Sequence, residues 1–195
     1  MFYKFRDFIP FADASSFVHP LAAVTGNVEI GRNVYIGPGA AIRGDFGKII
    51  IEDGSNVQEN CVIHSFPGAT VMLHENAHIG HGAILHGCTI GRNCLVGMNA
   101  VIMDEVELGE ECIVGALSFI GQRAVFERRS LIVGNPARKI KEVSDEMISW
   151  KAEGTRVYQQ LAADMLLHFE ACEPLREKSD AHIQQRGYRP WKKRQ

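Results

Sequence analysis

The sequence predicts an all-β solenoid followed by one C-terminal α-helix. The first observation is an aliphatic residue at every sixth position, a period that fits neither a helix nor an ordinary strand. The second is a small or β-branched residue four places after each aliphatic one, and the third is a single amphipathic pattern that begins near Ser144. At the start of the chain the period of six is carried by Val18, Val24, Ile30, Ile36 and Ile42.

A six-residue repeat of this kind supplies one short strand and one tight corner, and three repeats close one triangular coil. The aliphatic residue points inward, and the small residue closes the corner inside a narrow prism. Because each coil hydrogen-bonds to the next at about 4.8 Å, the stacked apolar residues form one continuous core. A sandwich of short strands is the alternative, but sandwich strands alternate with a period of two. The predicted small interior residues are Ala22, Val28, Val34, Ala40, Ser55, Cys61, Ala77, Ala83, Cys94, Ala100, Cys112 and Ser118.

The composition narrows the classes of function. The chain has 195 residues and a net charge of -2, which leaves no basic field for a nucleic acid partner. No segment is apolar and long enough for a signal peptide or a membrane span, so we expect a cytoplasmic protein with no membrane partner. Five cysteines without a CxxC pair favour core packing over metal or redox chemistry.

The β-helix domain, with its N-terminal lead-in, is expected over residues 1–143. Extra residues interrupt the period after Ile42 and after Ile63. Because insertions between solenoid repeats tend to project from one face, we expect loops to leave the prism over 43–48 and 65–70.

The C-terminal part begins with a turn-rich exit from the solenoid over 132–138. A helix is expected over 144–173, with Ser144 as its N-cap and acidic residues in its first turn. An apolar stripe formed by Met147, Trp150, Val157, Leu161, Met165 and Phe169 predicts that this helix docks along a solenoid. The remainder, 174–195, is predicted to be a polar tail.

Three of the eight histidines form a pattern that depends on counting repeats. His64 and His86 each follow an aliphatic residue, and three repeats plus a four-residue insertion separate them, which is one full coil. Their side chains are therefore predicted to stack about 4.8 Å apart at the backbone, which suits two imidazoles that bind one metal ion. His81 follows the preceding strand and belongs to another edge of the prism. The remaining histidines are predicted to be surface residues: His19, His74, His78, His168 and His182.

A prism cannot fold its own edges together, so a third histidine ligand would have to come from a neighbouring subunit of a closed trimer. Three histidine ligands that leave one open position are typical of catalytic zinc. The alternative is that these histidines are surface residues with no ligand. By the same counting, Arg43 lies one coil before His64 and Glu59 one coil before His81, so polar groups are expected along both edges.

A resemblance to the gamma-class carbonic anhydrase family, whose members are hexapeptide-repeat proteins, is carried by Arg43-Gly44-Asp45, 56–60, His64 and 80–88. Within that family the chain is similar to proteins of phenylacetate and carnitine pathways. The resemblance implies a left-handed parallel β-helix and a homotrimer with metal sites at the subunit interfaces. It implies zinc, with iron or cobalt as alternatives, held by His64 and His86 of one subunit and by His81 of the next. The residues implied to surround the metal are Arg43 and Asp45, as an ion pair between subunits, and Gln58 and Glu59, which flank a bound water.

The activity implied by the resemblance is that of a zinc-dependent lyase, in which a zinc-bound hydroxide attacks CO2 and forms bicarbonate. The loop over 65–70 contains no acidic residue but carries Phe66 and Pro67, which suit a larger apolar acyl group. Hydrolysis of an acyl-CoA thioester at the same metal is therefore the first alternative. A hexapeptide acyltransferase with a histidine general base is the second, and a non-catalytic assembly subunit is the third.

Overall fold

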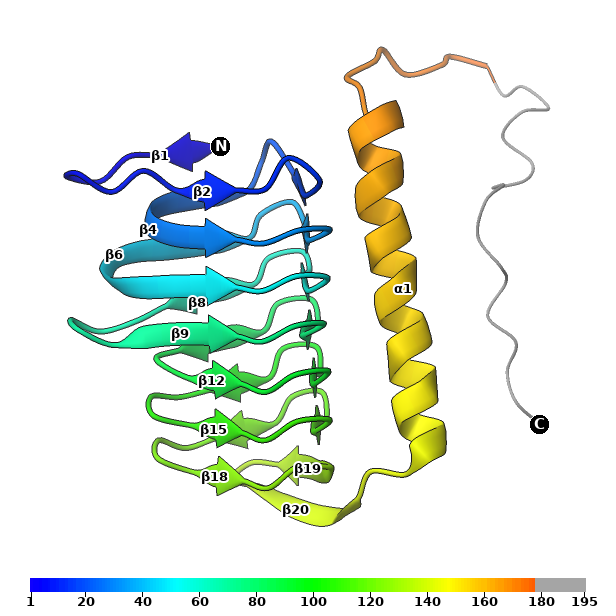
Figure 1. The fold of residues 1–195 in the computed structure, drawn as a ribbon. Coiled ribbons are helices and arrows are strands. Elements are labelled where there is room, and N and C mark those ends of the chain that lie inside the picture. The colour runs from blue at the N-terminus through cyan, green and yellow to red at the C-terminus, as the bar shows by residue number, and fades with distance from the viewer. Residues whose placement is uncertain (178–195) are drawn as a thin grey trace.

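The computed structural model of the chain describes residues 1–177. It is a left-handed parallel β-helix of triangular cross-section with one C-terminal helix, α1, as the sequence predicts. Figure 1 shows the coils stacked along one axis, with α1 running beside them. The predicted polar tail lies outside the described residues from position 178 onward. Within the part of the chain that the structure describes, no helix has the length and apolar character needed to cross a bilayer.

The prism has three faces, and the first two join into one 12-stranded sheet because two long strands pass around the corner between them. These strands are β4 (Ala23–Ile30) and β6 (Ala41–Ile51), and β1 (Phe2–Tyr3) pairs with the start of β4. The first face continues with β8 (Val62–His64), β11 (Ile84–His86), β14 (Val101–Ile102) and β17 (Phe119–Ile120). The second face contains β2 (Phe11–Ala12), β9 (Thr70–Leu73), β12 (Thr89–Ile90), β15 (Glu107–Leu108) and β18 (Val125–Phe126).

The third face is a separate 8-stranded sheet that lies next to α1. Its strands are β3 (Phe17–Val18), β5 (Tyr35–Ile36), β7 (Asn56–Val57), β10 (His78–Ile79), β13 (Leu95–Val96), β16 (Ile113–Val114), β19 (Ser130–Gly134) and β20 (Ala137–Glu142). All pairings on this face are parallel except the last, in which β19 and β20 form an antiparallel hairpin. This hairpin occupies the segment that the sequence predicted as a turn-rich exit.

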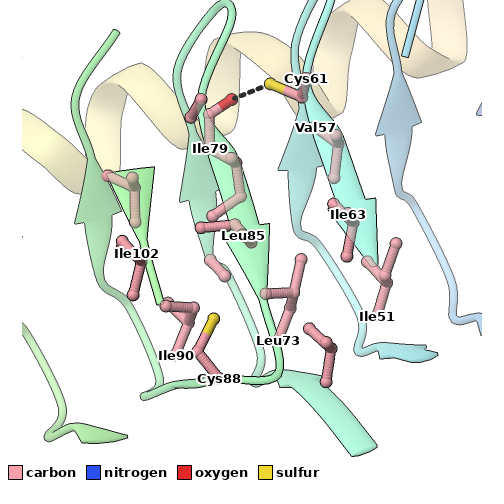
Figure 2. Packing of buried hydrophobic residues seen from close by; sticks show 14 of the residues in the cluster. Ile51, Val57, Cys61, Ile63, Leu73, Ile79, Leu85, Cys88, Ile90 and Ile102 are labelled. Carbon is pink, nitrogen blue, oxygen red and sulfur yellow. Dashed lines mark hydrogen bonds between the residues drawn. The ribbon is translucent and has the colours of Figure 1, made fainter. Parts of the chain in front are cut away.

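The core inside the prism confirms the interpretation of the six-residue period. Figure 2 shows aliphatic side chains of successive coils stacked inside the prism, among them Ile63, Leu85 and Ile102, each of which is buried. All twelve residues predicted to close the corners are also buried, and four of the five cysteines lie in the interior, whereas Cys172 is exposed. Because van der Waals packing in such an interior is as dense as in an organic crystal, each corner position has a strict limit on volume.

The corners repeat a left-handed backbone conformation three places after the aliphatic residue. From Asn93 to Arg129 a residue with positive φ recurs at every sixth position. Asn and Gly tolerate this conformation best, and Gly82 takes it with a φ of +69° at a corner where an added Cβ would meet the side-chain oxygen of Asn99. The period of six therefore applies to the backbone conformation as well as to the apolar side chains.

The two insertions behave differently from each other. The second leaves the prism as a loop between β8 and β9, as predicted. The first does not form a separate loop, because β6 continues as a strand through it and its pairing with β4 shifts register between Gly26 and Val28. Gly44 lies against the backbone of Asn27, too close for a side chain, so the extra residues are absorbed as a bulge.

The helix α1 (Asp145–His168) begins where the sequence predicts, with the hydroxyl of Ser144 accepting the backbone N–H of Met147 at 3.3 Å. It ends five residues earlier than predicted, because Phe169 adopts an extended conformation.

The face of α1 that contacts the solenoid matches the predicted apolar stripe only in part. Its buried residues are Lys151, Thr155 and Ala162, whereas Trp150 and Val157 of the stripe remain exposed. The helix therefore docks on its own solenoid through polar side chains in its first half and through an apolar cluster toward its C-terminus. In that cluster Leu161, Ala162 and Met165 pack against Phe17 and Tyr35 of the third face.

Candidate functional site

The corner between the first and second faces, here called the histidine corner, lies on the side of the prism away from α1 (Figure 1). His64 ends β8 and His86 ends β11, and the two residues are paired in register. Their rings approach closely, with His64 Nδ1 and His86 Nε2 separated by 3.2 Å. The side chain of His64 is 12% exposed and that of His86 is 30% exposed, so the pair is sheltered but open to solvent on one side. The predicted one-coil stack of the two imidazoles is confirmed.

A carboxylate holds each imidazole from its far side. His64 Nε2 lies 2.8 Å from Asp45 Oδ1, and His86 Nδ1 forms a short contact with Asp104 Oδ1. A carboxylate accepts an N–H, so these partners place the ring protons on His64 Nε2 and His86 Nδ1. Burial opposes ionisation of Asp45, but the hydrogen bond to His64 and the charge of Arg43 outweigh it and lower the pKa of the Asp45 carboxyl.

The consequence is that two unprotonated nitrogens face each other across 3.2 Å. Neither can donate a hydrogen bond to the other, so the pair is satisfied only when a proton or a cation occupies the space between them. Two nitrogens bound tetrahedrally to one zinc ion would lie about 3.3 Å apart, given metal–nitrogen distances of about 2.0–2.1 Å. The donor set of His64 and His86 therefore fits a shared proton and fits a divalent metal ion. Across residues 1–177 of a single chain, no group of three histidine, cysteine or acidic side chains is placed to hold a metal.

The third predicted ligand, His81, lies at the corner between the third and first faces, here called the glutamate corner. His81 Nδ1 forms a short contact with Glu59 Oε2, and Tyr35 donates its hydroxyl to Glu59 Oε1 at 3.0 Å. Burial and the charge of Glu59 raise the pKa of the Tyr35 hydroxyl, so that this group remains a donor. Glu59 thus orients His81 with its Nε2 free, at an edge that does not meet the histidine corner within one chain.

Gln58 is buried beneath α1 instead of lying at either histidine site. Its side-chain amide donates to Asn56 Oδ1 at 3.0 Å and to His78 Nε2 at 2.7 Å. The prediction that His78 is a surface residue is wrong: it packs edge-on against Tyr158, and burial lowers its pKa to about 4. His182, assigned to the surface with it, lies outside the described residues.

The remaining predicted site residues form an ion pair within one chain. Arg43 Nη1 lies 2.7 Å from Asp45 Oδ2, so Arg43 supports the carboxylate that orients His64. A pair between subunits stays a prediction. The sequence interpretation missed Asp104, although it stands 18 residues after His86, which is one coil of three repeats. It also missed Tyr35, for which the sequence offers no signal because its contact with Glu59 depends on the side chain of another coil.

Comparison with known proteins identifies the family. The bacterial transferase hexapeptide repeat (six repeats) matches residues 87–122. The carnitine operon protein CaiE of Salmonella agona is 47% identical over 174 residues, 89% of this chain and 88% of its own length. The CaiE protein of Escherichia coli K12 is 46% identical over 90% of both chains. This chain is a hexapeptide-repeat protein, and it belongs to the CaiE family.

Solved structures agree with this placement. The BC4754 gene product of Bacillus cereus, a candidate acetyltransferase, is 30% identical with a TM-score of 0.83, covering 85% of this chain and 96% of its own. A hexapeptide transferase family protein of Anaplasma phagocytophilum is also 30% identical, with a TM-score of 0.80, covering 83% and 95%. The N-acyltransferase AntD of Bacillus cereus, at 18% identity and a TM-score of 0.62, shares the fold.

These relatives correct the expected activity. The resemblance to proteins of the carnitine pathway is confirmed, but assignment to the gamma-class carbonic anhydrases is not supported. The prediction of a zinc-dependent carbonic anhydrase-like lyase, with thioester hydrolysis as its alternative, is wrong, because the relatives are CaiE proteins and transferases. The histidines and carboxylates of the two corners could not by themselves distinguish a carbonic anhydrase from a thioesterase or an acyltransferase. Imidazoles paired with carboxylates serve several kinds of chemistry.

Proposed function

We propose that the protein is an acyltransferase that moves an acyl group from a CoA thioester to a small alcohol or amine. The observation that carries the proposal is the 3.2 Å approach of His64 Nδ1 to His86 Nε2, in a pair of imidazoles that is backed by two carboxylates and open to solvent on one side. The hexapeptide-repeat family supports the same reaction class, and AntD, described as an N-acyltransferase and solved with coenzyme A, shares the fold.

In this mechanism the imidazole pair is the general base. One ring nitrogen takes the proton of the acceptor hydroxyl or amine while the acceptor atom attacks the thioester carbon. The carbon–sulfur bond then breaks, and the coenzyme A thiolate leaves with the proton returned from the imidazole pair. Asp104 and Asp45 hold the two rings in the required tautomers and stabilise the positive charge that forms when the pair accepts the proton.

The nitrogen–nitrogen distance favours a second candidate for the same site, a divalent metal ion. His64 and His86 of one subunit, with His81 of a neighbouring subunit, would hold zinc, iron or cobalt, and each imidazole has a carboxylate partner of the kind that orients metal-binding histidines. A bound metal would supply a Lewis acid and an activated water at this position. His81, at the glutamate corner, can complete this ligand set only from a neighbouring subunit. We therefore propose that the protein assembles as a trimer.

The test measures free thiol released from acetyl-CoA and longer acyl-CoA thioesters, with and without a panel of small amines and alcohols. We expect thiol release that depends on the acceptor in the wild type. The variants His64→Ala and His86→Ala should lose at least 100-fold, since general bases contribute about 10²–10⁴ in rate. His74→Ala is the matched control, because His74 pairs with a partly exposed glutamate, Glu52, at another corner. Release that proceeds equally without an acceptor would instead identify water as the acceptor and would contradict the transferase assignment.

The metal candidate is tested on the same preparations. Elemental analysis of protein purified without added metal should find about one ion per subunit in the wild type and far less in His86→Ala if the metal is present. A metal-free wild type that keeps full transfer activity in a chelator would leave the imidazole pair as the base and reject the metal.

A further inference from the structure

Two phenylalanine rings extend the imidazole pair at its two ends. The ring of Phe46 lies 5.5 Å from that of His64, and the ring of Phe66 stacks on His86 with centroids 6.4 Å apart and an interplanar angle of 22°. The two imidazole centroids are 5.2 Å apart. Phe46, His64, His86 and Phe66 therefore form one continuous row of four rings at the histidine corner.

The two insertions hold these phenyl rings in place. Phe46 comes from the bulge in β6 and Phe66 from the loop after β8, and the backbone N–H of Gly68 bonds to the carbonyl of Phe46 at 3.4 Å. Phe66 also lies over Gly87, where an added Cβ would meet its ring at 3.0 Å. The missing side chain at Gly87 thus leaves the space that the ring of Phe66 uses. Both additions to the six-residue period serve to place an aromatic ring beside a histidine.

Both rings remain open to solvent in the chain. Phe46 is 56% exposed and Phe66 is 36% exposed, although each borders polar and charged groups of the histidine pair. Exposed aromatic surface beside a sheltered acid–base pair has the character of ligand pockets, in which apolar walls surround a few polar groups. The two phenyl rings lie next to the imidazole nitrogens that would take part in the reaction. The part of the substrate that would contact these rings is therefore the chain attached to the thioester carbonyl carbon.

We propose that Phe46 and Phe66 bind the acyl chain of the thioester and make the site selective for apolar acyl groups longer than acetyl. This inference rests on the proposed function. The row of rings places the acyl carbonyl near the imidazole pair and the hydrocarbon part along one phenyl face, where burial of methylene groups favours longer chains.

The test separates binding from catalysis by using unreactive thioethers of coenzyme A, S-ethyl-CoA and S-hexyl-CoA, in titration calorimetry on the full-length protein. Each fully buried methylene is worth roughly three- to fourfold in affinity, so partial burial of four methylenes predicts that the hexyl compound binds at least about tenfold tighter. In Phe46→Ala and Phe66→Ala the preference should fall to within about threefold. The matched control is Phe8→Ala, which removes an equally exposed ring at the N-terminal end of the prism and should keep the full preference.

The outcomes distinguish this inference from the proposed function. Equal binding of the two thioethers by the wild type, or an unchanged preference in both variants, would overturn the acyl-chain role. A loss of affinity that is equal for the two probes would do the same, because it would indicate a structural role for the rings. A chain-length preference that depends on both rings, in a protein that transfers no acyl group, would support the binding role and reject the transfer reaction. Size-exclusion chromatography of each variant checks that substitution leaves the assembly intact.

Discussion

At the scale of single residues, the state of the site is decided by the carboxylates behind the histidines. His86 can present its Nε2 toward His64 only while its Nδ1 proton is held by Asp104. An amide in place of that carboxylate would fit the same space but would offer an N–H as readily as an oxygen. The ring would then lose both its preferred tautomer and the negative charge that stabilises its protonated form.

Asp104→Asn is therefore expected to reduce acyl transfer by about 10- to 100-fold with little change in fold, because outer partners of functional histidines have effects of that size. The rate of thiol release at saturating acceptor measures the loss. Glu105→Gln is the control, since Glu105 is the next residue and pairs with the exposed Arg123. Equal activity of Asp104→Asn and the wild type would show that the tautomer of His86 does not limit the reaction.

At the same scale, the interior of the prism limits the side-chain volume of the residues at its corners. Ala100 is fully buried at a corner of the prism, where a leucine would force neighbouring coils apart. Ala100→Leu is expected to lower the free energy of unfolding by about 1–3 kcal/mol. Val101→Leu, at the adjacent and partly exposed position, is the control with an added methylene outside the core. Urea unfolding compares the two variants, and equal midpoints would contradict a tightly packed prism.

At the scale of secondary-structure elements, α1 is attached to the solenoid by a buried lysine. Lys151 Nζ donates to the carbonyl of Asn76 and, at 2.8 Å, to the side-chain oxygen of Asn93, which stand at the same corner of successive coils. Thr155 and Gln159 add hydrogen bonds along the same face of the helix. Leu161 and Met165 of the predicted stripe pack against Phe17 and Tyr35 of the solenoid, whereas Trp150 and Val157 are exposed. Helical periodicity alone therefore selected the buried face only in part.

This attachment makes stability depend on pH. Burial lowers the pKa of Lys151 to about 7, compared with an ordinary value of 10.5. Between these values the unfolded chain binds more protons than the folded one, so the stability contributed by this group is lost as the pH falls from about 10.5 to about 7. Below pH 7 both states are protonated and this contribution no longer changes. Thermal unfolding from pH 6 to 9 should therefore show a steeper rise of Tm in the wild type than in Lys151→Met. Parallel curves for the two proteins would show that the lysine stays charged in the folded state.

At the scale of the whole molecule, the prism separates its functional groups between two corners. The histidine corner carries His64 and His86, and the glutamate corner carries His81 with Glu59. A rigid solenoid with one continuous core cannot bring these corners together. A site that uses all three histidines must therefore form between subunits.

Mixed trimers test this arrangement. His64→Ala and His81→Ala should each be inactive alone if the site lies between subunits. After co-refolding in equal amounts, about a quarter of the interfaces would contain all three histidines, so activity should recover to about that fraction of the wild type. Recovery is measured by thiol release on the purified mixed trimers. Full activity of His81→Ala by itself would place the whole site within one subunit.

The amount that could be predicted from the sequence differs between the backbone and the side chains. The coil register, the buried corner residues, the stack of His64 on His86 and the start of α1 all followed from counting residues. The β19–β20 hairpin and the continuous β6 did not, because both depend on how a segment outside the period packs on the last or the neighbouring coil. The burial of Gln58 under α1 could not be predicted either, since it depends on His78 and on a helix distant in the sequence.

What the sequence by itself determined was the prism and the position of each residue on its edges, because a period of six stacks the coils so that the aliphatic residues recurring at that period are buried. Only the tertiary structure decided which carboxylate orients each imidazole, which face of α1 is buried and where Phe46 and Phe66 lie. Those features depend on side-chain directions and on contacts between coils or between the solenoid and the helix, and a residue count contains neither. The chemistry of the histidine corner belongs to this second group, since two imidazoles become a base or a metal site only through the protons that their partners hold.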